Sequence, residues 1–363
     1  MVLNKLELSS LIITGTRPEI IKMSPVYLEM KKTGATVYWC HTGQHQSLAD
    51  QTFEAFGIQP DFCLQRPEGV GVAMLVSGLM ANLDRLLKAH DFSCVLVHGD
   101  TASTLAGALT AFYNQVPVIA HVEAGLRSGD LRHPFPEESN RLLVARMANL
   151  HFPPTKGAYD ALNKENVPHG QVCITGNTAI DAQKVLLESG MVERKQSNKV
   201  LVTAHRRENW EHVDTICKAI IELTSLKPDL EFIFAVHPNP QIKRIVEERL
   251  ALVPQVTISE PLDYLQLQKL LAEVKLVLTD SGGIQEEAPT YGKRVVVLRE
   301  TTERPEAVQL GFSILTGASD IKRIIDGAMT MLALGDFEQD KNPFGDGQAS
   351  KRIVIEIAAR LEC

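Results

Sequence analysis

The chain has 363 residues, 44% of them hydrophobic and 22% charged, which is typical of a globular protein of about two domains. A net charge of -7 and the lack of any basic tail or stripe argue against a nucleic-acid-binding protein. Six scattered cysteines with no CxxC pair indicate free thiols. No signal peptide and no apolar run of membrane-spanning length is evident, so we expect a cytoplasmic protein without a membrane partner.

Short apolar, β-branched runs alternate with helical stretches along the whole chain. Strands are predicted at 11–14, 37–40, 94–97, 118–122 and 172–175, and then at 200–203, 232–236, 256–258, 276–279, 295–298 and 313–315. Continuous apolar strands between amphipathic helices are typical of parallel sheets covered on both faces. These strands are too many for one compact sheet. We therefore expect an α/β protein with two lobes, at 1–180 and 181–346.

Polar motifs follow most of these predicted strands. They read GTRPE from Gly15, HTGQH from His41, HGDT from His98, EAG from Glu123, AHRR from Ala204, HPN from His237, DSGG from Asp280 and RETTER from Arg299. In open α/β sheets, ligands bind beyond the carboxyl ends of the strands. We therefore expect the chemistry on one edge of each sheet, and two such edges facing each other would form a cleft.

The first motif, Gly15–Glu19, predicts a turn from a strand into a helix. Gly15 permits a tight bend, and Pro18 suits the first turn of a helix. Free backbone donors at the helix start favour an anion, and Arg17 and Lys22 add positive charge. The alternative is a capped helix whose charges are merely solvated.

The motif that begins at Asp280 predicts a second anion-binding turn. Ser281, Gly282 and Gly283 allow the backbone to approach a phosphate closely, in front of a helix N-terminus. A carboxylate one turn into that helix can accept hydrogen bonds from ribose hydroxyls. An ordinary glycine-rich turn is the alternative.

Three carboxylates are candidate acids and bases. Asp100 and Glu123 follow buried strands directly, and Glu137 lies at the entry to a helix. Carboxylates clustered beside apolar sheet edges are expected to have raised and separated pKa values, which suits acid–base work near neutral pH. For Asp100 the alternative role is capping the helix that begins after it.

Basic residues end a strand in the second half. His205, Arg206 and Arg207 could bind a diphosphate, because arginine forks match phosphate oxygens. A surface turn paired with Glu208 is the alternative. No HExxH or clustered ligand spacing predicts a metal, and neither GxGxxG nor GxxxxGK[ST] is present, so no dinucleotide or ATP cofactor is expected.

Taken together, TGTRPEIIKMSP, HTGQH, VHGDTASTLAGALTAFY, HVEAGLRSGD, PFPEESNR, ITGNTAIDA, TAHRRENW, HPNP, LTDSGGIQEEAP and RETTERPEA resemble the non-hydrolysing UDP-N-acetylglucosamine 2-epimerases. The resemblance runs from about residue 11 to the C-terminus. It implies a glycosyltransferase-B fold with two Rossmann-like lobes, an interlobe cleft, and a last helix, about 347–363, that packs back on the first lobe. It also implies homodimers.

The resemblance implies the chemistry as well. The family interconverts UDP-N-acetylglucosamine and UDP-N-acetylmannosamine without a nicotinamide cofactor. A base removes the proton on carbon 2 as UDP departs from carbon 1, which leaves 2-acetamidoglucal. UDP then re-adds while a proton returns on the other face.

The family's functional positions fall on the motifs already described. The matching catalytic positions are Asp100, Glu123, Glu137 and His205; the matching substrate-binding positions are Arg17, Lys22, Ser281, Gly282, Gly283 and Glu287, and we add Arg206. The match leaves open which carboxylate acts on which face. Where many bacterial members hold an activating second UDP-N-acetylglucosamine, this chain departs from the pattern at Ser47 and at 69–71.

Other functions compete with this reading. The same fold serves epimerases of related UDP-N-acetyl sugars, hydrolysing relatives that release free N-acetylmannosamine, glycosyltransferases and non-catalytic sensors. Three placed carboxylates in the first lobe favour proton transfer over glycosyl transfer or sensing. The product is expected to supply N-acetylmannosamine-type sugars for surface polysaccharide.

Overall fold

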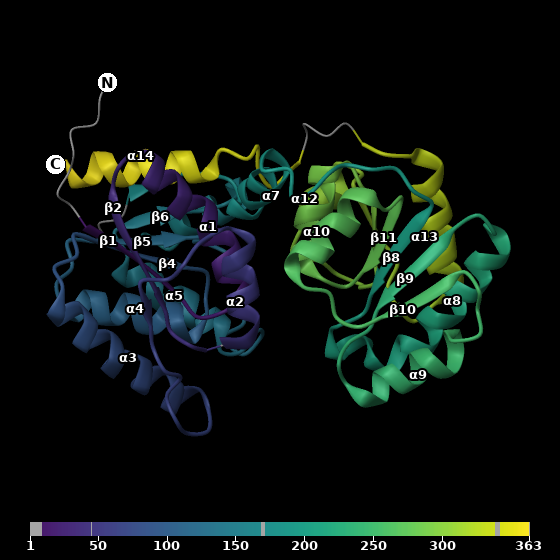
Figure 1. Cartoon of the computed structure of the whole chain (residues 1–363), viewed down its shortest axis with the longest axis horizontal. Helices are drawn as coiled ribbons and strands as arrows, with labels where there is room; N and C mark the ends of the chain where they lie inside the picture. Colours follow the sequence, from purple (N-terminus) through teal and green to yellow (C-terminus); the bar gives the residue numbers. More distant parts are fainter. Residues whose placement is uncertain (1–8, 45, 168–170, 338–341, 363) are drawn as a thin grey trace. The chain divides into compact units, whose positions relative to one another are not determined.

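The computed structural model describes residues 9–44, 46–167, 171–337 and 342–362. The chain divides into two compact units, one made of Met1–Val185 with Phe344–Cys363 and the other of Leu186–Pro343. Each unit is built around one parallel β-sheet with helices packed against it (Figure 1). The predicted α/β fold with two sheets is therefore confirmed.

The sheet of the first unit has seven parallel strands. They are β1 (Ser9–Thr14), β2 (Thr36–His41), β3 (Phe62–Cys63), β4 (Cys94–His98), β5 (Val118–Val122), β6 (Leu150–Phe152) and β7 (Gln171–Val172). Their order is β3-β2-β1-β4-β5-β6-β7, so the direction of winding reverses between β1 and β4. A ligand crevice in such a sheet lies at this reversal, beyond the carboxyl ends of the strands. The sequence patterns did not predict β3 and β6.

Helices cover both faces of this sheet. They are α1 (Arg17–Lys32), α2 (Gln46–Ala55), α3 (Val72–Ala89), α4 (Ala102–Tyr113), α5 (Glu137–Met147), α6 (Lys156–Lys164), α7 (Thr178–Glu188) and α14 (Ala349–Leu361). Alternate strand residues, including Leu11, Ile13, Val95 and Val97, face α3 and α4 in one apolar core. Burying these alternate side chains fixes the register of the strands.

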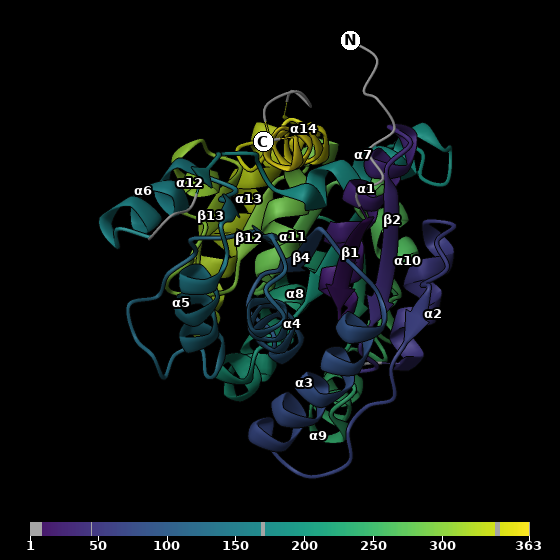
Figure 2. The ribbon, with the colours of Figure 1, turned by 90° about the vertical axis from the view of Figure 1, so that its left-hand side faces the viewer.

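The C-terminal helix α14 packs against α1 (Figures 1 and 2). Its start is held by Asp181, whose carboxylate accepts hydrogen bonds from the Ser350 amide and hydroxyl, both at 2.7 Å. Asp181 and Ser350 are both buried. The last segment of the chain is thereby fastened to the first unit.

The second unit repeats the same design with six parallel strands. The strands are β8 (Lys199–Thr203), β9 (Glu231–Ala235), β10 (Val256–Ser259), β11 (Leu276–Thr279), β12 (Val295–Val297) and β13 (Ser313–Leu315). Their order is β10-β9-β8-β11-β12-β13, which reverses between β8 and β11. All six strands predicted in this half are present, with ends shifted by one residue at most.

The helices of the second unit cover its sheet in the same way. They are α8 (Val213–Leu226), α9 (Pro240–Leu250), α10 (Tyr264–Glu273), α11 (Gly282–Glu287), α12 (Pro305–Gln309) and α13 (Ile321–Leu334), with short 3-10 helices η1 (Arg207–His212) and η2 (Ala288–Tyr291). Core side chains of α8, α9 and α13 pack on Val200, Val202, Phe232 and Phe234. Within the described residues, none of the helices combines the length and apolar character that a membrane span needs.

Candidate functional site

The turn after β1 is filled by a carboxylate of its own helix. The Gly15 and Thr16 amides donate to Glu19 at 3.1 and 2.7 Å, so Glu19 occupies donors that were expected to meet an anion. Glu19 is buried, and burial raises its pKa against the hydrogen bonds that lower it. The expectation that this turn offers free donors is wrong at these two amides, because the Glu19 carboxylate, which forms a capping box with Thr16, accepts both.

Gly15 is needed because neighbouring side chains pack tightly against its backbone, and not because its backbone is left-handed. A Cβ atom at this position would lie 1.9 Å from the Ser103 hydroxyl and 2.5 Å from the Thr42 hydroxyl. Any side chain here would therefore collide with the start of α4. The turn after β1 and the turn after β4 are pressed together at the point where the strand order reverses.

The two basic residues of α1 are in different situations. Arg17 is half-buried and makes no ion pair or hydrogen bond among the described residues, so its guanidinium remains available to a ligand. The Lys22 ammonium instead pairs with Glu123 at the end of β5. Of these two predicted substrate contacts, Lys22 is thus already engaged with a predicted catalytic group.

Asp100 follows β4 and is not the cap of α4. That cap is Thr101, whose hydroxyl accepts the Thr104 amide. The Asp100 carboxylate instead accepts a hydrogen bond from Arg141 Nε of α5 at 2.7 Å, and Arg141 Nη2 lies 2.6 Å from the same oxygen in an ion pair. The alternative role of helix capping is therefore wrong, and Asp100 is held by a cation.

Glu123 lies in a charged cluster at the next strand end. Its backbone has a φ of +60°, a left-handed conformation that non-glycine residues seldom adopt and that is often found at functional sites. The carboxylate meets Lys22, and His98 Nε2 lies 3.7 Å from it. Its Oε1 atom lies 4.0 Å from the position that a Cβ atom on Gly99 would occupy. Gly99 directly precedes Asp100 in the chain.

The charge around Glu123 reverses the expected pKa shift. Burial alone would raise the pKa of this carboxyl, as the sequence suggested. The charge of Lys22 and its hydrogen bond, together with the nearby His98, outweigh burial and hold the pKa well below its usual value. The predicted raised pKa is wrong for Glu123, because a strand-end carboxylate with a buried cation beside it stays ionised.

Glu137 is the first residue of α5 and is only partly buried. Its carboxylate makes no ion pair or hydrogen bond with the part of the chain that the structure describes. The peptide bonds before Pro134 and Pro136, in the segment that leads into this helix, are both cis. Of the three candidate carboxylates, Glu137 is the one left open to a ligand.

In the second unit, a buried aspartate organises the basic turn after β8. Asp280 accepts hydrogen bonds from the His205 amide at 3.0 Å, the Arg206 amide at 2.9 Å and the Asn209 side chain at 2.9 Å. The Arg206 side chain donates back to the Asp280 carbonyl at 3.0 Å. His205 and Arg206 are thus fixed at the reversal between β8 and β11, where a crevice is expected.

The predicted phosphate turn follows Asp280. Ser281 caps α11 by accepting the Ile284 amide, and Gly282 and Gly283 open the helix. A Cβ on Gly282 would lie 2.9 Å from the Arg304 guanidinium, so the arginine rests directly on this glycine. Arg304 is the last residue of the RETTER motif and is not among the predicted site residues. Its packing on Gly282 joins two distant segments, and no local sequence pattern predicts it.

Glu287 is held by a chain of buried groups. The Gln268 side chain donates to its carboxylate at 2.6 Å, and the Tyr291 hydroxyl donates to Gln268 at 2.9 Å. Gln268 and Tyr291 are both almost fully buried. This support fixes the carboxylate's direction, which hydrogen bonding to a ribose would require.

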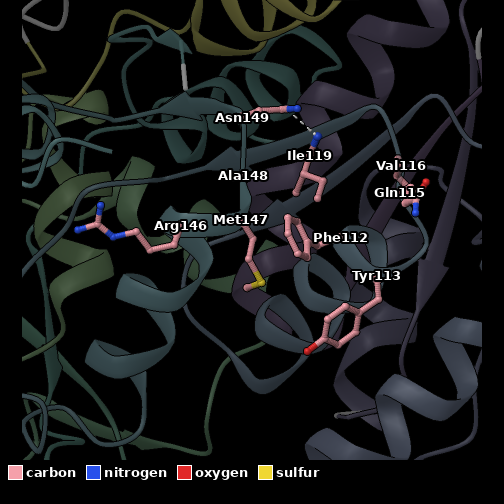
Figure 3. A pocket seen from close by; sticks show the side chains of 9 residues that line it. All are labelled: Phe112, Tyr113, Gln115, Val116, Ile119, Arg146, Met147, Ala148 and Asn149. Atoms are coloured by element: carbon pink, nitrogen blue, oxygen red, sulfur yellow. Dashed lines mark hydrogen bonds between the residues drawn. The ribbon is translucent and has the colours of Figure 1, made fainter. Parts of the chain in front are cut away.

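Two of the hollows in the described residues are relevant here. One of about 250 Å³ lies at the carboxyl edge of the second sheet, beside Glu208, Asn209 and the buried Arg299. The other, of about 560 Å³, is formed by the ends of α4 and α5 with the amino ends of β5 and β6 (Figure 3). Phe112 and Tyr113 lie on its rim, 53% and 67% exposed. It is at the opposite edge of the sheet from Asp100 and Glu123.

Three remaining features of the sequence concern metal ligands, the HTGQH motif and the cysteines. No group of three or more His, Cys, Asp or Glu side chains fit to hold a metal occurs in the described residues. His45 of the HTGQH motif and the side chain of Ser47, where a departure from the family pattern is predicted, lie outside the described residues. Five cysteines are free thiols, and Cys363 lies outside the described residues.

The fold and the placement of these residues define a class of protein. Each unit is a Rossmann-like parallel sheet with polar groups at its reversal point, and solved structures with the same architecture are nucleotide-sugar enzymes of the glycosyltransferase-B type. UDP-GlcNAc 2-epimerase from Neisseria meningitidis, bound to UDP-GlcNAc, aligns with a TM-score of 0.85 and 37% identity, covering 97% of this chain and 100% of that one.

Sequence comparison specifies the family. The family model described as UDP-N-acetylglucosamine 2-epimerase matches residues 28–358. The UDP-N-acetylglucosamine 2-epimerase of Bacillus subtilis (strain 168) is 42% identical, with 97% of this chain and 95% of the relative covered. The Methanocaldococcus jannaschii UDP-GlcNAc 2-epimerase in complex with UDP-GlcNAc and UDP aligns with a TM-score of 0.80 at 32% identity, over 97% of this chain and 99% of that one. The chain belongs to the UDP-N-acetylglucosamine 2-epimerase family.

Proposed function

We propose that this protein interconverts UDP-N-acetylglucosamine and UDP-N-acetylmannosamine by inverting carbon 2. The observation that carries the proposal is the set of carboxylates at one end of the first sheet: Asp100 after β4, Glu123 after β5 and Glu137 at the start of α5. Inversion needs proton acceptors and donors on both faces of one carbon, and three carboxylates are more than binding requires. Family membership supports the same substrate.

With carboxylates in these positions, the reaction proceeds by elimination of UDP and its re-addition. A carboxylate takes the carbon 2 proton while the bond from carbon 1 to the diphosphate oxygen breaks, giving 2-acetamidoglucal and UDP. Re-addition of UDP at carbon 1 and return of a proton on the opposite face of carbon 2 complete the inversion. The low pKa of Glu123 keeps it a carboxylate near neutral pH. The open Glu137 is suited to proton exchange.

The negative charge that develops on the departing UDP needs hydrogen-bond donors to stabilise it. We assign these to His205 and Arg206, fixed by Asp280, and to the turn at Ser281, Gly282 and Gly283. Arg17, which has no internal partner among the described residues, adds a further positive group. Preorganised donors of this kind stabilise a leaving group without having to reorient. Glu287 is assigned to the ribose hydroxyls.

We further propose a cytoplasmic homodimer whose product feeds surface polysaccharide. The rim of the hollow in Figure 3 supports a contact between copies, since Phe112, Tyr113 and Met147 line it together and exposed aromatic side chains are enriched in subunit contacts. Light scattering should give twice the chain mass, and Tyr113→Asp should shift it toward one chain mass. A monomeric wild type would contradict this assignment.

The activity is tested by incubating the purified protein with UDP-N-acetylglucosamine and separating the nucleotide sugars. We expect UDP-N-acetylmannosamine to accumulate to an equilibrium reached from either side. Free N-acetylmannosamine with stoichiometric UDP would indicate a hydrolysing enzyme. UDP release only with an added acceptor would indicate a glycosyltransferase, and turnover confined to a deoxy or diacetamido UDP-sugar would indicate a related epimerase.

A further inference from the structure

The first turns of α5 carry Glu137 and also hold Asp100. Asn140 and Arg141 lie three and four residues after Glu137, which places all three on one face of the helix. The Asn140 side chain donates to the Asp100 carbonyl at 2.8 Å, and Arg141 holds the Asp100 carboxylate. Asp100 is thus fixed at both its backbone and its side chain by the helix face that begins with Glu137.

Arg141 is itself held in place. Its Nη1 atom donates to Glu138 at 2.9 Å, while Nε and Nη2 face Asp100, so the guanidinium bridges two carboxylates. Glu138 is buried and also accepts the Ser128 and Gly129 amides, at 3.0 and 3.1 Å. Burial would raise the Glu138 pKa, but these two amides and Arg141 lower it, so it remains an anchoring anion.

We infer that Arg141 is a positioning residue that fixes Asp100 relative to Glu137. The inference rests on the proposed function, since it supposes that these two carboxylates exchange protons with one sugar carbon. Proton transfer requires each group within hydrogen-bonding reach, and misplacement by about 1 Å costs on the order of 100-fold in rate. Only a guanidinium reaches both Asp100 and Glu138 in this geometry, because its donors are arranged as a planar fork.

The experiment measures kcat and KM for Arg141→Ala and Arg141→Lys, with Arg146→Ala as the matched control. Arg146 lies on the same helix, and among the described residues its side chain makes one hydrogen bond, to the Asn166 carbonyl at 3.3 Å. We expect Arg141→Ala to lower kcat about 100-fold with KM changed less than about threefold. Arg141→Lys should lower kcat about tenfold, because one ammonium cannot make both contacts. Arg146→Ala should keep kcat within about twofold.

Chemical rescue separates positioning from a general structural role. The Arg141 side chain is 16% exposed, so free guanidinium from solution has access to the vacated space. We expect added guanidinium at tens of millimolar to restore kcat of Arg141→Ala at least about fivefold, and to leave Arg146→Ala and the wild type unchanged. A loss of kcat that guanidinium does not restore would overturn the inference.

The remaining outcomes are also decisive. If Arg141→Ala does not fold, the folded Arg141→Lys variant decides, and its kcat within about threefold of wild type overturns the inference. A folded Arg141→Ala variant with near-normal kcat also overturns the inference. A wild type that does not epimerise UDP-N-acetylglucosamine contradicts the proposed function instead, and the role of Arg141 falls with it.

Discussion

Lys22→Met tests the account of the Glu123 cluster through stability. The side chains of this ion pair are 13% and 15% exposed, so removing the ammonium leaves a largely buried carboxylate without its cation. Breaking a buried pair on one side costs about 3–5 kcal/mol, and the remaining exposure places this case near about 3 kcal/mol. At about 2–4 °C per kcal/mol for a domain of this size, the melting temperature at pH 8 should fall by about 6–12 °C.

The pH dependence of this loss has a definite sign. In the wild type, the depressed Glu123 pKa contributes stability above the unfolded pKa, and this is lost as pH falls through the folded value. Without Lys22, burial is no longer outweighed, and the Glu123 pKa rises. The penalty of Lys22→Met should therefore be largest at pH 8 and shrink toward pH 5, as Glu123 takes up a proton.

Two controls make the test specific. Lys32→Met removes a lysine from the same helix whose 3.5 Å pair with Glu29 is exposed, and it should leave stability unchanged. In a Glu123→Gln background, Lys22→Met should cost less than about 1 kcal/mol, because no charge is left unpaired. Equal losses in both backgrounds, measured by urea unfolding, would refute the ion-pair explanation.

Three further predictions concern the proposed catalytic edge. Asp280→Ala should destabilise the second unit by about 3 kcal/mol in urea unfolding and lower kcat at least about 100-fold, because the buried donors of the turn after β8 lose their acceptor. Gly15→Ala should cost about 1–3 kcal/mol in thermal unfolding, since its methyl group would collide with α4; an unchanged melting temperature would contradict the close contact. Asp100→Asn and Glu137→Gln should each lower kcat by a factor of about 10²–10⁴ while calorimetric UDP binding stays within about twofold.

The strands that carry the chemistry could be predicted from local pattern, and the missed ones show its limits. Runs such as Val118–Val122 and Leu276–Thr279 are mostly apolar, are buried along their whole length and are followed by polar motifs. β6 is only three residues long and has a buried histidine, His151, at its centre. β3 has two residues. Neither segment has the continuous β-branched run that predicts β12, which is also three residues long, so β3 and β6 depend on their neighbours in the sheet.

The same distinction between local sequence pattern and packing of distant segments applies to the candidate site. Motif position indicated Asp100, Glu123 and Ser281, because residues at the carboxyl ends of parallel strands meet at one edge. The partners that set their geometry, Arg141 and Asp280, depend on packing between segments distant in sequence. The pKa of Glu123 was misjudged for this reason, since the expected burial is real but a lysine from α1 reverses its effect.

The most direct test of the proposed activity follows the hydrogen on carbon 2. The protein is incubated with UDP-N-acetylglucosamine in heavy water, and carbon 2 of both nucleotide sugars is followed by NMR. Elimination and re-addition predict deuterium at carbon 2 of UDP-N-acetylmannosamine from its first appearance, and later in the recovered substrate. An epimerised product that keeps its original hydrogen at carbon 2, or a substrate left unchanged, would contradict the proposed function.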